Sequence, residues 1–382
     1  PAGEKSSPHW QRSFAVKCRC DLWVLCAVLA LTGTGFLFVY SASMYTALSY
    51  GSQYYFLFKQ LLGGAAGFAA MAFFRFVKID LLKKFYIAAV VVSALLLGCV
   101  FIPGLGIENY GAKRWIGFGG FSFQPSEIAK FSFVLFCAAY ASRRDMKKFP
   151  NVLPVAAVGG AFCLLIILEP NMSITMCMAA LMAVMLFLSG VRIKHFLLLL
   201  CPLVAAVPLL IVAEPYRLQR LLAFLDPWAS PKDEGYQLIQ SLYALGRGGF
   251  FGVGLFNGRQ KYLFLPFAES DFILSVIGEE TGLIGCLAVF LLYFVVIFRG
   301  IRIAANCRDK FRCYLAAGIT AVIAVQSLLN FAVVTGSIPP TGLPLPFISY
   351  GGTSLVVFLS AAGILLNLSA EIKSREGVVW IT

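Results

Sequence analysis

The sequence predicts an all-α polytopic membrane protein with ten transmembrane helices and one long extracytoplasmic loop between spans seven and eight. Of its 382 residues, 60% are hydrophobic and 13% are charged, which is more apolar surface than a water-soluble fold can bury. The apolar residues are gathered in stretches of about 20, the length of a membrane-crossing helix. Cations are concentrated in alternate loops, as expected of a chain threaded through a bilayer.

The predicted spans follow one another with short links and form one membrane domain over 1–382, without a soluble domain. They cover residues near 22–44, 55–77, 85–104, 125–142, 152–168, 171–190, 195–213, 272–298, 313–336 and 350–369. An N-terminal arm (1–21) and a tail (370–382) flank them. The only insertion of size is 214–271, and we expect function to concentrate in this loop.

Lys and Arg set the predicted orientation, because cytosolic loops retain cations. The arm, the tail and the loops after spans two, four, six and eight carry two to five cations each. The opposite side has Lys113 and Arg114, and six more cations from Arg217 to Lys261. We therefore expect both termini to be cytosolic in the inner (cytoplasmic) membrane. The net charge of +13 fits this bias and attraction to anionic membrane lipids, and does not call for nucleic acid as a partner.

The long loop has three recognisable parts. Residues 216–225 place Arg217 and Arg220 on one helical face with leucines around the other, which predicts a helix in the membrane interface. Residues 236–245 predict a second short helix. Six glycines between Gly246 and Gly258 then allow the backbone to approach a ligand closely or to re-enter the membrane, although a flexible surface loop is the alternative.

Asp271 begins span eight, where a carboxylate contacts water on one side and low-dielectric surroundings on the other. Its pKa could be raised there, and such a group is suited to accept a proton from a sugar hydroxyl. An ordinary helix cap is the alternative, because Asp at a helix start complements the helix dipole.

Other polar residues lie in or beside the spans. Glu127 and Lys130 are spaced to form an ion pair on one helical face, with substrate contact as the alternative. Glu279 and Glu280 need a partner or a water-filled cavity, and Lys59 either reaches the interface or meets one of these acids.

Cations of the outer side have two alternative roles. Lys113 and Arg114, followed by Trp115, could anchor the chain at the headgroup level. Alternatively, several cations converge on a lipid-linked pyrophosphate, namely Arg114, Arg217, Arg220, Arg247, Arg259 and Lys261. No Cys or His lies on the predicted outer face, so no zinc site is expected there.

Several motifs occur together in a fixed order. They are Gly111-Ala112-Lys113-Arg114-Trp115-Ile116, Phe123-Gln124-Pro125-Ser126-Glu127-Ile128-Ala129-Lys130, Tyr236-Gln237 with Gln240-Ser241-Leu242, Ser270-Asp271-Phe272-Ile273, and Gly342 to Thr353 with Ser349-Tyr350-Gly351-Gly352. With these motifs the chain resembles the SEDS family (shape, elongation, division, sporulation) of peptidoglycan glycosyltransferases, which includes FtsW, RodA and SpoVE. Leu225-Asp226-Pro227-Trp228 and Gly235-Tyr236-Gln237 are more similar to the FtsW branch than to RodA.

The resemblance implies polymerisation of lipid II (undecaprenyl-pyrophosphate-linked disaccharide peptide) during cell division, with Asp271 as the general base. Undecaprenyl pyrophosphate would be the leaving group, and a divalent cation (Mg or Mn) could assist its departure, although no ligand cluster for one is readable. A class B penicillin-binding protein and other divisome proteins are the implied partners. The implied substrate-binding residues are Lys113, Arg114, Gln124, Glu127, Lys130, Arg217, Arg220, Gln237, Lys261 and Ser349.

Two departures from the family pattern concern the outer side. Glu169-Pro170-Asn171 stands where the family usually has Gln-Pro-Asp, and Glu269 stands where His is common. A charge at Glu269 would raise the pKa of Asp271 by repulsion. Three other functions remain open: a lipid II flippase with a polar path through Glu127, Lys130, Glu279 and Glu280, an elongation-type (RodA-like) polymerase, and an idle scaffold for the penicillin-binding protein.

Overall fold

The computed structural model describes residues 20–109, 112–118, 121–212, 215–233 and 235–376. A helix occupies each of the ten predicted spans: α2 (Leu22–Ser43), α3 (Tyr55–Phe76), α5 (Tyr86–Cys99), α6 (Pro125–Ala141), α7 (Phe149–Leu168), α8 (Met172–Leu188), α9 (Ile193–Val212), α12 (Ile273–Asn306), α13 (Lys310–Val334) and α14 (Gly352–Glu376). The predicted cytosolic arm falls almost entirely outside the described residues, whereas the tail is described as far as Glu376, where α14 ends.

Length and composition identify a membrane protein in this set of helices. Within the described residues, six helices are long and apolar enough to cross a bilayer, namely α2, α3, α7, α12, α13 and α14. Large apolar side chains on several helices face outward, among them Phe76, Leu95 and Phe187. A surface of this kind needs lipid around it, because soluble proteins do not expose so much apolar area.

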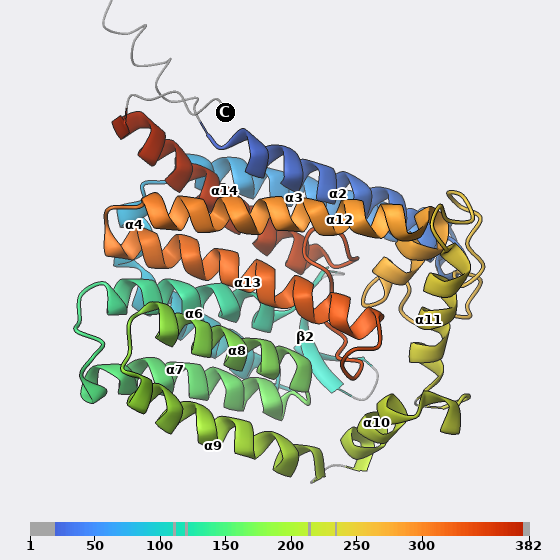
Figure 1. The fold of residues 1–382 in the computed structure, drawn as a ribbon, viewed down its shortest axis with the longest axis horizontal. Helices are drawn as coiled ribbons and strands as arrows, with labels where there is room; N and C mark the ends of the chain where they lie inside the picture. The colour runs from blue at the N-terminus through green and yellow to red at the C-terminus, as the bar shows by residue number, and fades with distance from the viewer. Residues whose placement is uncertain (1–19, 110–111, 119–120, 213–214, 234, 377–382) are drawn as a thin grey trace, which may run out of the picture.

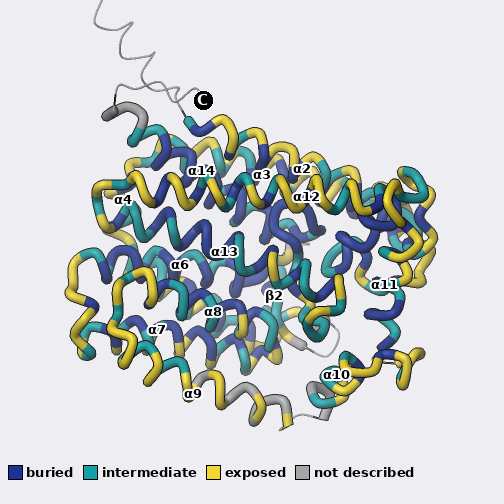
Figure 2. Tube along the Cα trace, in the orientation of Figure 1, coloured by how far each residue is buried: buried dark blue, intermediate teal, exposed yellow. Residues whose placement is uncertain are grey.

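The helices lie side by side with their axes roughly parallel (Figure 1). α3 packs along α14, α12 packs against both α2 and α13, and α13 also contacts α6 and α8. Buried residues are concentrated where these helices face one another (Figure 2). α13 therefore lies at the centre of the bundle, which becomes important for the site.

One end of the bundle contains α4 (Ile79–Lys84) and the link between α12 and α13, both predicted to be cytosolic (Figure 1). Ion pairs join the elements at this end. Arg299 of α12 binds Asp21 before α2 at 2.5 Å, and Arg312 of α13 binds Glu371 of α14 at 2.7 Å. These pairs connect four helices, and both arginines are among the cations counted in the loop after span eight.

The opposite end contains the long loop, with two helices where they were predicted: α10 (Pro215–Leu225) and α11 (Tyr236–Gly248). It also contains a feature that the sequence analysis missed. Strands β1 (Gly106–Asn109), β2 (Ala112–Phe118) and β3 (Phe121–Phe123) form an antiparallel sheet in the order β1-β2-β3. The all-α prediction therefore holds for the spans but not for this outer loop.

Span eight is interrupted. Gly282 inside α12 has φ 69° and ψ −165°, so the helical hydrogen bonds break there. The glycine-rich loop fills the break. Leu283 and Ile284 donate their N–H groups to the carbonyls of Gly249 and Phe250 at 2.9 and 3.3 Å. The carbonyls of Glu279 and Glu280, on the other side, accept from Val253 and Gly254 at 3.0 Å each.

The glycine run packs against the backbone of α12, whereas the sequence analysis expected it to approach a ligand or to re-enter the membrane. A Cβ on Gly248 would lie 1.9 Å from the carbonyl oxygen of Gly278. A Cβ on Gly252, where φ is +80°, would lie 2.2 Å from that of Glu280. Only glycine fits such contacts, so these glycines allow the loop to pack directly against the backbone of α12.

Candidate active site

Asp271 lies just before the first turn of α12, in a segment whose backbone is held firmly. The carbonyls of Glu269, Ser270 and Asp271 each accept a hydrogen bond. Their donors are the Tyr350 N–H at 2.9 Å, the Ser349 hydroxyl at 2.5 Å and the Asn330 side-chain amide at 2.8 Å. Two donors come from the segment before α14 and one from α13, so two distant parts of the chain fix this residue.

The carboxylate of Asp271 has different surroundings from its backbone. In the described part of the chain it forms no ion pair, and the residue is half-buried. The pKa of Asp271 is raised to about 6, chiefly by burial and in addition by the charge of Glu269. The charges of Arg220 and Arg114 and the Ser270 hydroxyl lower it. The predicted effect of Glu269 is confirmed in direction, while burial is the larger cause.

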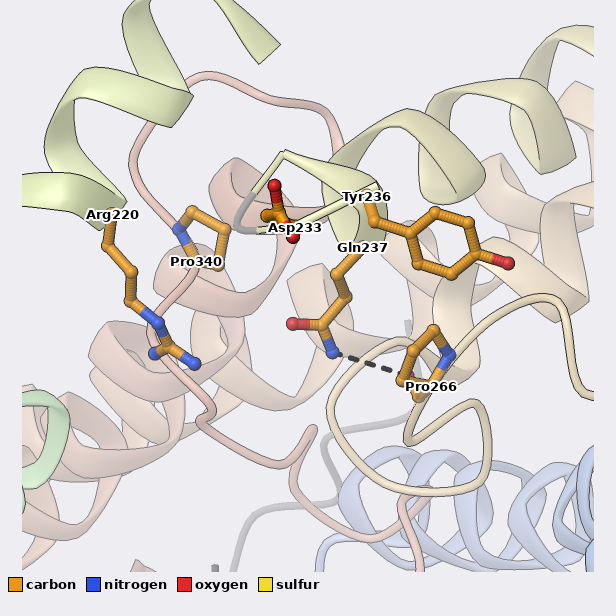
Figure 3. A pocket seen from close by; sticks show the side chains of 6 residues that line it. All are labelled: Arg220, Asp233, Tyr236, Gln237, Pro266 and Pro340. Atoms are coloured by element: carbon orange, nitrogen blue, oxygen red, sulfur yellow. Dashed lines mark hydrogen bonds between the residues drawn. The ribbon is translucent and has the colours of Figure 1, made fainter. Parts of the chain in front are cut away.

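A cavity of about 180 Å³ lies beside this segment, between the long loop and the bundle. Figure 3 shows Arg220 of α10 and Gln237 of α11 extending toward the same space, and the Gln237 amide donates to the carbonyl of Pro266 at 3.2 Å. The lining residues are Arg220, Asp233, Tyr236, Gln237, Pro266 and Pro340. Arg220, which lines the cavity, also lies close enough to Asp271 for its charge to lower the pKa of that carboxyl.

Arg114 approaches the site from β2. Its guanidinium donates to the carbonyl of Glu169 at 3.4 Å and to that of Pro170, which fixes it on the turn between α7 and α8. Its charge reaches Asp271 as well. Lys113 is the neighbouring residue of the same strand and is exposed, and successive strand residues project to opposite faces. The predicted pair of cations is thus divided, and Arg114 is the one at the site.

The unusual Glu169-Pro170-Asn171 turn has a structural explanation. The Asn171 side chain caps α8 by accepting from the Ile174 N–H at 3.3 Å. Glu169 is buried, and neither carboxylate oxygen has a hydrogen-bond partner in the structure. Burial raises the pKa of Glu169 to about 8, while the charge of Arg114 lowers it. A protonated Glu169 is neutral, like the Gln that the family usually carries.

Lys261 does not face a phosphate site, contrary to the prediction. It is fully buried, and its ammonium binds Glu280 at 2.9 Å and the hydroxyl of Ser41 at 3.2 Å. Arg247 is likewise paired, with Glu279 at 2.9 Å. These contacts satisfy the acids of span eight, which sequence analysis expected to need partners.

Arg259 contributes its backbone and not its charge to the same region: its N–H donates to Glu279 at 2.8 Å. Arg217 lies on α10, but its side chain falls outside the described residues. Of the six cations predicted to converge, the structure brings Arg114 and Arg220 to Asp271.

Glu127 and Lys130 form the predicted ion pair, at 2.8 Å. Both side chains are fully buried, so their predicted contact with substrate is not available in this structure. Lys130 also donates to the amide of Gln326, and Glu127 accepts from Ser354 at 3.2 Å. Lys59 donates to the hydroxyl of Tyr55 at 2.6 Å, and no acid in the described part of the chain pairs with it.

Two further predicted substrate residues serve the fold. The Ser349 hydroxyl is used twice internally, because besides donating to Ser270 it accepts from the Leu345 N–H at 2.8 Å. Gln124 is 8% exposed, and its backbone N–H donates to Thr353 at 3.3 Å. The Ser349 hydroxyl is thus occupied by contacts within the protein.

Sequence analysis overlooked three amides that organise the site: Gln60, Gln326 and Asn330. Gln60 donates to the carbonyl of Ser349 at 3.1 Å and accepts from Gly351 at 3.2 Å. The signal was present, because an amide in an apolar span needs internal partners. Among the described residues no group of three or more His, Cys, Asp or Glu side chains could hold a metal ion.

Comparison with known proteins identifies the family to which this chain belongs. The family model of FtsW, RodA and SpoVE, described as a cell cycle protein, matches residues 22–374. The chain belongs to the FtsW/RodA/SpoVE family. The family match covers all ten helices, the sheet and the long loop with Asp271.

Two relatives illustrate the membership. The probable peptidoglycan glycosyltransferase FtsW of Geobacter sp. (strain M18) is 38% identical over 357 residues, which is 92% of this chain and 97% of that protein. Stage V sporulation protein E of Bacillus subtilis (strain 168) is 38% identical over 353 residues, covering 91% and 96%.

Solved structures of family members share the fold. One, reported as "Structural coordination of polymerization and crosslinking by a peptidoglycan synthase complex", has a TM-score of 0.78 at 26% identity and covers 93% of this chain and 99% of that one. RodA of Thermus thermophilus has a TM-score of 0.67 at 23% identity, covering 94% and 98%, which supports the fold alone.

Proposed function

We propose that this protein is a peptidoglycan glycosyltransferase that polymerises lipid II at the outer face of the cytoplasmic membrane during cell division. The observation that carries the proposal is Asp271: its backbone is fixed, its carboxylate forms no ion pair with any described residue, and its pKa is raised to about 6 near a cavity lined by Arg220. Relatives named as probable glycosyltransferases of the FtsW type support the reaction class.

In the proposed reaction Asp271 accepts the proton of the acceptor sugar's 4-hydroxyl. The hydroxyl oxygen attacks the anomeric carbon of the growing chain with inversion, and undecaprenyl pyrophosphate leaves. A carboxylate with a pKa near 6 is mostly ionised at pH 7 and is a stronger base than an exposed Asp. Arg114 and Arg220 would stabilise the departing pyrophosphate. A divalent cation would be held mainly by the phosphate oxygens of the substrate, since Mg²⁺ often binds through phosphates together with one or two carboxylates.

The proposed topology has ten membrane crossings, cytosolic termini and an extracytoplasmic loop over 214–271. Support comes from the ten helices and from the distribution of cations between the two ends of the bundle. The proposed partner is a class B penicillin-binding protein, together with other divisome proteins. The peptidoglycan synthase complex that contains the structural neighbour supports such a partner.

A flippase is less well supported. The four residues expected to line a polar path, Glu127, Lys130, Glu279 and Glu280, are all buried and paired. An elongation role is also not favoured, because several of the relatives carry the FtsW name.

The proposal is tested with purified protein and fluorescent lipid II, with and without the partner, by separating glycan products on a gel. Wild type should yield polymer and Asp271→Ala none, while Asp226→Ala, an exposed acid of the same loop, should match wild type. Normal polymer from Asp271→Ala would reject the proposed base. Lipid II that moves between leaflets without being polymerised would support the flippase instead.

A further inference from the structure

α13 carries two buried amides one helical turn apart, Gln326 and Asn330, in an otherwise mostly apolar span. Asn330 uses both of its side-chain N–H groups. One donates to the carbonyl of Asp271 and the other to the carbonyl of Leu343, each at 2.8 Å. A single side chain therefore joins the residue of the proposed base to the irregular segment before α14.

These two acceptors belong to the segments that meet at the carboxylate. Gly342, immediately before Leu343, has φ +68°, and a Cβ there would lie 3.2 Å from Asp271 Oδ2. The backbone of Gly342 is thus packed directly against the carboxylate. By holding both Leu343 and Asp271, the amide sets the spacing between the carboxylate and this turn.

Gln326 extends the same arrangement. Its amide donates to the carbonyl of Pro344 at 2.8 Å, and its side-chain oxygen accepts from Lys130. Two successive carbonyls of the proline-rich segment are therefore held by α13. Proline has no N–H and prevents regular pairing, so this segment depends on side chains for its position.

The chemistry of the amide suits the place. Asn330 is 1% exposed, so an aliphatic residue would leave the carbonyls of Asp271 and Leu343 without this donor. An amide also adds no charge beside Asp271. A carboxylate at position 330 would remove both donors and add a second negative charge.

We propose that Asn330 is a positioning residue, which holds the Asp271 carboxylate against the Gly342 turn in its reactive orientation. This rests on the proposed function, since it assumes that Asp271 is the base. Asn330 acts through the backbone and does not touch the reacting atoms.

The test compares Asn330→Leu with Asn367→Leu in lipid II polymerisation. Asn367 is a matched control on α14: it is 7% exposed, and its amide also donates to two carbonyls, those of Phe74 and Val77, at the opposite end of the bundle. For Asn330→Leu we expect kcat to fall at least tenfold, KM to stay within about twofold, and the acid limb of the pH-rate profile to move to lower pH, because a loosened Asp271 is better hydrated.

Asn367→Leu should keep both kcat and the acid limb. Wild-type kcat and acid limb in Asn330→Leu would overturn the proposal, as would an equal loss in both variants with an unshifted limb. Asn330→Asp preserves size if the Leu variant does not fold, and its second carboxylate should move the acid limb to higher pH; an unmoved limb there also overturns the proposal.

Failure of the proposed function gives a different result. A wild-type protein that makes no polymer with its partner, or an Asp271→Ala variant that does, rejects the glycosyltransferase itself. If the wild type is active and Asn330→Leu changes neither kcat nor the acid limb, only the positioning role is rejected.

Discussion

Asp271 and the Glu279–Glu280 pair lie within ten residues of one another at the outer part of α12, yet their surroundings are opposite. Both glutamates are fully buried, and every one of their carboxylate oxygens has a partner. Asp271 is half-buried, its backbone is held, and within the described ranges its carboxylate has no ion-pair partner. The contrast separates acids that hold the loop from the acid that is available for chemistry.

Electrostatics reinforce this division. Glu280 has Lys261 as an ion-pair partner at 2.9 Å, and both side chains are buried. Asp271 instead has Glu269 as an acidic neighbour, and the cations Arg220 and Arg114 only lower its pKa part of the way back. A group whose charged form is destabilised in this way takes up a proton readily.

The largest effect is expected from removing the carboxylate of Asp271, the acid available for chemistry. Asp271→Asn keeps size and removes the base, so polymerisation should fall by about 10²–10⁴. Thermal stability in detergent should change little, because the backbone contacts of residue 271 do not involve the carboxylate. Single-turnover rates and melting curves measure the two effects, and a large loss of stability with normal activity would reverse the assignment.

The next largest effect is expected on stability, from breaking the buried pair of Glu280 and Lys261. Glu280→Gln leaves Lys261 buried without its counter-ion, and removal of one member of a buried pair costs roughly 3–5 kcal/mol. The variant should melt at lower temperature or fail to accumulate. Glu280→Gln combined with Lys261→Met should recover part of the loss, and a double variant less stable than the single one would argue against the pair.

Glu169 offers a test of stability against pH. Its pKa is raised from 4.5 to about 8, so the folded state binds the proton more tightly than the unfolded state does. The stabilisation is complete below pH 4.5 and is lost as pH rises toward 8, by up to roughly 1.4 kcal/mol per pH unit. Melting temperatures from pH 5 to 8 should fall more steeply for wild type than for Glu169→Gln, and parallel curves would contradict this.

The smallest expected effect sharpens the role of Glu269. Polymerisation by wild type should rise with pH through about 6 as Asp271 ionises. Glu269→Gln removes the repulsion, so the acid limb should move to lower pH while burial keeps it above 3.8. An unchanged pH-rate profile would show that Glu269 does not act on the base.

The spans could be predicted because their signal is local: an apolar stretch of sufficient length forms a helix wherever it sits in a bilayer. The i,i+3 pair of Glu127 and Lys130 and the helices α10 and α11 were predictable for the same reason. The strands were missed although Phe118-Gly119-Gly120-Phe121 carries the Gly-Gly pattern of a hairpin. Short aromatic strands near a span resemble interfacial anchors in composition.

The site was only partly predictable, because it depends on contacts between distant segments. Asp271 could be identified from its position and the family motif. The burial of Lys261 could not, since its partners Ser41 and Glu280 lie 220 and 19 residues away. Asn330 was missed because nothing in α13 indicates which carbonyls its amide will meet.

The interruption at Gly282 bears on biogenesis. The carbonyls of Gly249 and Phe250 accept hydrogen bonds from Leu283 and Ile284, which are synthesised later. In the proposed topology this loop is translocated before the following span enters the bilayer, so these two bonds form last. Completion of the loop is thus coupled to insertion of span eight, and a nascent chain stalled before that point would display an incomplete loop.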